Sequence, residues 1–60
     1  MVAELSSMST ALDELAARLG GMADDLAGSQ RDDVAVALFE VERSLRHAQR
    51  RLAKVVDDLT

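Results

Sequence analysis

The regular apolar pattern of the chain breaks once, at Leu26-Ala27-Gly28-Ser29-Gln30-Arg31-Asp32-Asp33-Val34. Gly28 can adopt the left-handed backbone conformation that ends a helix. Ser29 followed three residues later by Asp32 resembles a capping box, and Asp33 adds negative charge where a helix N-terminus favours it. This stretch therefore predicts the end of one helix and the start of another, with a turn at residues 28–31.

Large apolar residues recur at alternating spacings of three and four on both sides of this break. Such a heptad stripe is typical of helices that pack as a coiled coil. Before the break, the stripe consists of Leu5, Met8, Leu12, Leu15, Leu19, Met22 and Leu26. After the break, it consists of Val34, Leu38, Val41, Leu45, Ala48, Leu52, Val55 and Leu59. We expect one helix over about residues 5–27 and a second over about residues 32–59.

The short turn requires the two helices to lie side by side and antiparallel. In that arrangement the residue numbers of facing stripe residues sum to 60, from Leu5 opposite Val55 to Leu26 opposite Val34. We therefore predict an all-α fold, in which residues 1–60 form a single domain. Its architecture is an antiparallel two-helix hairpin with coiled-coil-like packing.

Two features leave the limits of the first helix open. Adjacent glycines at Gly20-Gly21 cost a helix interior roughly 1 kcal/mol each, so a turn between two shorter helices is one interpretation. Because the stripe continues in register on either side of them, we expect one continuous helix. Thr10 and Asp13 have the spacing of a capping box, which would start the helix only near Thr10.

The composition of this chain of 60 residues restricts the kinds of site it can form and the kind of organism and compartment expected for it. Cysteine is absent and there is one histidine, which argues against disulfides, thiolate metal sites and clusters of imidazole ligands. Isoleucine and asparagine are also absent, and six arginines accompany one lysine, as expected of a GC-rich bacterial genome. The longest apolar run, Val34 to Phe39, is too short for a signal peptide or a membrane span. We expect a cytoplasmic bacterial protein.

An isolated hairpin of this size buries too little apolar surface to offset the conformational entropy of its ordered residues. We therefore expect a partner: a second copy, giving a homodimeric four-helix bundle, or alternatively another helical protein. Small residues would let the backbones approach, and Phe39 would fill the remaining gap. The predicted self-association residues are Ala16, Gly20, Ala23, Ala35, Phe39 and Val56. For any single alanine, the competing interpretation is simply a good helix former on the surface.

Charge is segregated along the chain. Residues 43–54 carry five cations and no acid, namely Arg43, Arg46, Arg50, Arg51 and Lys54. One interpretation is an anion site for nucleic acid, a nucleotide or a membrane surface. The favoured interpretation is a solvated face, with Asp13 and Glu14 beside Arg46 and His47. A net charge of −4 also argues against a general nucleic-acid binder.

The sequence offers little for catalysis. His47 is the only histidine, and Ser44 lies three residues before it without a third group to complete a catalytic set. Adjacent aspartates on a helix point about 100° apart, so they do not converge on a metal. This applies to the pairs Asp24-Asp25, Asp32-Asp33 and Asp57-Asp58. We expect no enzyme, no cofactor and no metal. The predicted function is a non-enzymatic interaction or regulatory module, and the alternative is a small regulator that binds nucleic acid or another anion.

The predicted architecture resembles that of small hairpin proteins that dimerise into four-helix bundles, including the Rop family of plasmid-encoded RNA-binding regulators. The resemblance is one of architecture and includes no shared motif. It implies nucleic-acid binding only as the alternative function.

Overall fold

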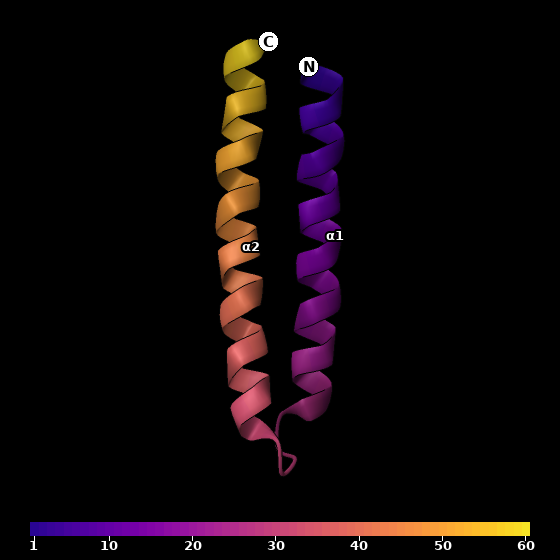
Figure 1. Cartoon of the computed structure of the whole chain (residues 1–60), viewed down its shortest axis with the longest axis vertical. Helices are drawn as coiled ribbons and strands as arrows, with labels where there is room; N and C mark the ends of the chain where they lie inside the picture. Colours follow the sequence, from indigo (N-terminus) through magenta and orange to yellow (C-terminus); the bar gives the residue numbers. More distant parts are fainter.

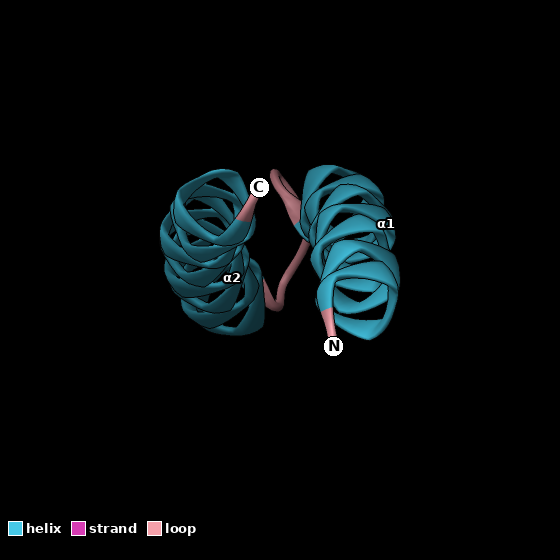
Figure 2. Ribbon diagram, turned by 90° about the horizontal axis from the view of Figure 1, so that it is seen from above, coloured by secondary structure: helices cyan, strands magenta, loops and turns pink.

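A computed structural model describes all residues, 1–60, as two long helices joined by a short turn (Figure 1). Helix α1 spans Val2–Leu26 and helix α2 spans Asp32–Leu59. The helices run antiparallel and side by side, with both chain ends at one end of the molecule and the turn at the other. Seen along its length, the hairpin has no third element covering either face (Figure 2). The predicted all-α hairpin is confirmed.

Helix α1 is longer than the sequence pattern indicated and has no interruption. It passes through Gly20-Gly21 without a break, as expected. The capping start near Thr10 was wrong, because the Thr10 hydroxyl donates to the Ser6 carbonyl oxygen one turn earlier, at 3.2 Å, inside an established helix. Neither helix carries an apolar segment that could cross a membrane.

The turn between the helices is held by Gly28, Ser29 and Asp32. Gly28 has a φ of +82°, the left-handed conformation expected of it. The Ser29 hydroxyl donates to the Leu26 carbonyl oxygen at 2.6 Å and accepts from the Arg31 N–H at 3.0 Å. The Asp32 carboxylate accepts from the Gly28 N–H at 2.7 Å. The predicted capping box was therefore wrong, since Ser29 satisfies the end of α1 and Asp32 reaches back across the turn.

The contact between the helices lies to one side of the predicted stripe. Its most buried members are small residues: Ser9, Ala16, Ala23 and Ala35. They alternate with half-buried leucines, which are Leu5, Leu12, Leu19, Leu26, Leu38, Leu45 and Leu52. The stripe prediction is thus right for these seven leucines, while the other stripe residues are mostly exposed, Leu15 and Leu59 among them. Small side chains at the contact allow a close approach of the two helix axes, which rotates the longer residues outward.

The predicted register along the helices is close to the observed one. Gln49 donates to the Ser9 hydroxyl, and Arg46 pairs with Asp13. The residue numbers of these pairs sum to 58 and 59, near the expected 60. Helix α1 therefore lies at the predicted height along α2, rotated slightly about its own axis.

Candidate interaction surfaces

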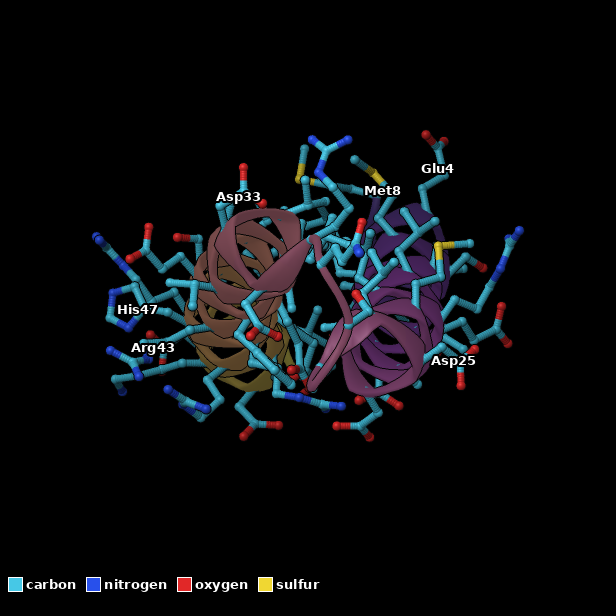
Figure 3. All side chains as sticks on the ribbon, turned by 90° about the horizontal axis from the view of Figure 1, so that it is seen from below. Glu4, Met8, Asp25, Asp33, Arg43 and His47 are labelled. Atoms are coloured by element: carbon cyan, nitrogen blue, oxygen red, sulfur yellow. The ribbon has the colours of Figure 1, made fainter.

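One side of the hairpin exposes a continuous set of apolar side chains. We term this set the open face: Met8, Leu15, Met22, Val41, Ala48 and Val55. Its five larger members are between 45% and 56% exposed. Figure 3 shows Met8 on one side of the helix pair, whereas Arg43 and His47 point outward from α2. Exposed apolar patches are a common property of association sites on soluble proteins.

The open face consists of one row of residues on each helix: Met8, Leu15 and Met22 on α1, and Val41, Ala48 and Val55 on α2. Helix geometry places both rows on the same side of the hairpin. Each row has a spacing of seven residues, about two turns, so it runs nearly parallel to the helix axis. Each row also precedes by one position a row of residues at the helix contact: Ser9, Ala16 and Ala23 in α1, and Glu42, Gln49 and Val56 in α2. One position is a rotation of 100°, and antiparallel helices rotate in opposite senses. Both rows therefore turn away from the contact toward one common side.

The hairpin lacks a core of large, fully buried side chains. Its most buried apolar residues are alanines, and no large side chain is fully buried. Its accessible surface is 4424 Å², whereas a compact monomer of this mass exposes about 3,800 Å². The elongated hairpin therefore exposes more surface than a compact monomer of its mass.

The edge of the helix contact opposite the open face is lined by polar residues that pair with one another. Arg46 lies 3.3 Å from Asp13 Oδ1 and 3.0 Å from Glu42 Oε2. Gln49 donates to the Ser9 hydroxyl at 3.1 Å. We term this set, Ser9, Asp13, Glu42, Arg46 and Gln49, the polar face. The hairpin is thus two-sided, with internal pairing on one side and exposed apolar side chains on the other.

Four of the residues predicted for self-association lie in contacts within one hairpin. Ala16, Ala23 and Ala35 are at most 3% exposed and lie between the two helices of one hairpin. Gly20 faces the Glu42 carboxylate at the polar face. These four residues are already used inside the hairpin, because small residues are the ones that let its own two helices approach.

The other two residues predicted for self-association lie outside the open face. Val56 is half-buried at the helix contact. Phe39 is 37% exposed and lies beside arginines, where it lines a shallow surface depression with Glu42, Arg43, Arg46 and Arg50. The open face could be found in the sequence in two steps. The small residues are first assigned to the contact between the helices, and the stripe residues that do not lie at this contact then form the open face.

The five predicted anion contacts fall into two groups. Arg46 is paired with Asp13 and Glu42, and Lys54 lies 3.6 Å from Asp58 Oδ1. The remaining three, Arg43, Arg50 and Arg51, have no carboxylate within 4.0 Å. Arg43 and Arg50 line a second shallow depression on α2 together with Ser44 and His47. The expected pairing of this segment with Asp13 is present, and it involves one arginine only.

No family model, curated protein or solved structure matches this chain.

Proposed function

We propose that the chain is a non-enzymatic interaction module that self-associates through the open face into a homodimeric four-helix bundle. The supporting observation is the contrast between a helix contact made of alanines and a row of half-exposed methionine, leucine and valine side chains beside it. Covering these side chains with a second copy gives them the burial that the hairpin alone does not provide. A different helical protein is the competing occupant.

The size of the open face suits a dimer. The Cα envelope measures 47 × 13 × 10 Å, so the broad side of the hairpin presents roughly 600 Å² before side chains are added. Stable interfaces bury about 800 Å² from each partner. A dimer that covers the whole open face therefore reaches the size of a specific interface.

Sedimentation of the purified chain at several protein concentrations tests the proposal. We expect a dimer, and a melting temperature that rises with protein concentration because the folded state is the associated one. Leu15→Glu should convert the dimer to monomer, since it places a charge inside the proposed interface. Val36→Glu is the matched control, because Val36 is 58% exposed and lies outside the open face.

Two results would contradict self-association. One is a folded monomer with a melting temperature independent of concentration. The other is an equal effect of Leu15→Glu and Val36→Glu on the sedimentation of the chain. Stoichiometric binding of a different helical protein to the monomer would identify the competing occupant.

A second candidate function, anion binding, has one specific observation in its favour. Arg43, Arg50 and Arg51 are free of carboxylate partners within one segment of α2. Mobility-shift assays with mixed-sequence RNA and DNA test this candidate. A phosphate contact predicts binding that weakens steeply as salt rises and that is lost in the Arg43→Ser/Arg50→Ser variant. Absence of binding at low salt would remove this candidate and leave the first one intact.

A further inference from the structure

We propose that the two hairpins of the dimer associate with their turns at the same end, so that α1 of each copy packs on α2 of its partner. This inference rests on the proposed self-association and specifies how the two open faces fit. A two-fold axis along the bundle produces this arrangement. A two-fold axis across the bundle would instead place the turns at opposite ends, with α1 on α1 and α2 on α2.

The two rows of the open face differ in side-chain length. The row on α1 consists of the long residues Met8, Leu15 and Met22. The row on α2 consists of the shorter residues Val41, Ala48 and Val55. Packing α1 on the partner's α2 sets long side chains against short ones along the whole interface, which fills space evenly. Packing like on like would crowd one half of the interface and leave the other half underfilled.

The observed register adds to this argument. Two residues are at the same height when they occupy the same position along the long axis of the hairpin. Within the hairpin, the numbers of such residues on α1 and α2 sum to nearly 60. With turns at the same end, heights are preserved, so Met8 lies level with the space between the partner's Ala48 and Val55. Leu15 then lies level with the space between the partner's Val41 and Ala48. The long side chains of α1 therefore meet gaps in the facing row, as knobs meet holes in a helical bundle.

Charge favours the same arrangement. Outside the polar face, helix α1 carries four carboxylates and one cation, Arg18, whereas residues 43–54 of α2 carry four cations and no acid. Packing α1 on the partner's α2 brings the acidic helix beside the basic segment, and packing like on like brings acid to acid and base to base. Arg18, which the observed register places level with residues 40–41, then comes near the partner's Glu40. Neither Arg18 nor Glu40 has an ion partner within its own hairpin.

Distances between spin labels decide the orientation. A label at Gln30→Cys reports on the turn, where Gln30 is exposed and makes no hydrogen bond. Turns at the same end place the two labelled backbones roughly 10–15 Å apart, since neighbouring helix axes are 8–10 Å apart. Turns at opposite ends place them nearly the 47 Å length of the hairpin apart. A long distance would overturn the inference.

A matched label at Asp57→Cys, near the other end of the hairpin, should also give a short distance. Mixed dimers that carry one label at each position should give a long one. A short distance in the mixed dimer would overturn the inference. Sedimentation of the labelled chains separates the two levels of failure: a monomer refutes self-association itself, whereas a dimer with distant turns refutes only the orientation.

Charge reversal gives an independent test. Arg18→Glu disrupts two symmetric ion pairs at the edge of the interface, so the dissociation constant should rise roughly fivefold. The double variant Arg18→Glu/Glu40→Arg should restore the original affinity. A failure of restoration would overturn the Arg18–Glu40 contact and, with it, the same-end arrangement.

Discussion

Gly20 leaves the space that the Glu42 carboxylate occupies: a Cβ atom at residue 20 would lie 2.9 Å from Glu42 Oε2. The same oxygen lies 3.0 Å from Arg46 Nε, and the Glu42 side chain is 22% exposed. A glycine whose sequence context suggested contact with another chain therefore serves a contact within its own hairpin.

Alanine substitutions at the two adjacent glycines should differ in effect. Gly21→Ala adds a methyl group in open space within a helix, so it should raise the free energy of unfolding by about 1 kcal/mol. Gly20→Ala gains the same helix propensity but displaces Glu42 from Arg46, so its net effect should be close to zero. Urea denaturation at one fixed protein concentration measures both variants. Equal stabilisation by the two would contradict the contact between Gly20 and Glu42.

Ala16 should not tolerate a larger side chain. It is fully buried between the helices, and Ala16→Leu would force them apart at a cost of about 1–3 kcal/mol. Ala17→Leu introduces the same side chain at an exposed neighbouring position and should change stability by less than about 0.5 kcal/mol. Thermal unfolding followed by circular dichroism compares the two. Similar melting temperatures would mean that the contact between the helices lies elsewhere.

The turn should depend on Asp32 more than on Asp33. Both aspartates lie in the first turn of α2, so both lose the same interaction with the helix dipole when replaced. Asp32→Ala also removes the acceptor of the Gly28 N–H, which should lower the free energy of unfolding by a further ~0.5–1 kcal/mol. Asp33→Ala loses only a 3.5 Å contact with Arg31 between largely exposed groups. Denaturant midpoints of the two variants provide the test, and a larger loss for Asp33→Ala would contradict the structure of the turn.

Arg46 should matter more for stability than Asp13. The Asp13 side chain is 60% exposed, so Asp13→Ala should cost less than about 0.5 kcal/mol. Arg46→Ala removes both ion pairs and leaves the less exposed Glu42 without a partner, so it should cost about 1 kcal/mol. Chemical denaturation at low and high salt would show the difference and its screening. If Asp13→Ala were the more harmful change, the Glu42 contact would be the minor one.

The architecture was predictable because its determinants are local in the sequence. Gly28 and the break in apolar spacing fix the position of the turn, and the continued spacing across Gly20-Gly21 correctly indicated one helix. The rotation of each helix about its axis was not predictable from the spacing of large residues. A row of leucines lies next to both a row of small residues and a row of methionines, and heptad spacing does not distinguish which neighbour faces inward. Packing distance decides it, and alanines at the contact permit the shorter distance.

The same rotation places several of the predicted association residues inside the hairpin. Ala16, Ala23 and Ala35, predicted for association between copies, are buried between α1 and α2. The hydroxyl of Ser9 and the amide of Gln49 bond to each other across this contact, although the apolar pattern gave no signal for them. Polar residues within a helix contact are specified by mutual hydrogen bonding, which depends on three-dimensional proximity.

The side-by-side position of the first and last residues has a practical consequence for anyone who tags the molecule. Halves of a split fluorescent reporter fused to Met1 and Thr60 would be neighbours within one copy, so they would reassemble without any dimer being present. To report pairing between copies, one half must therefore be fused to one molecule and the complementary half to the same terminus of a separate molecule.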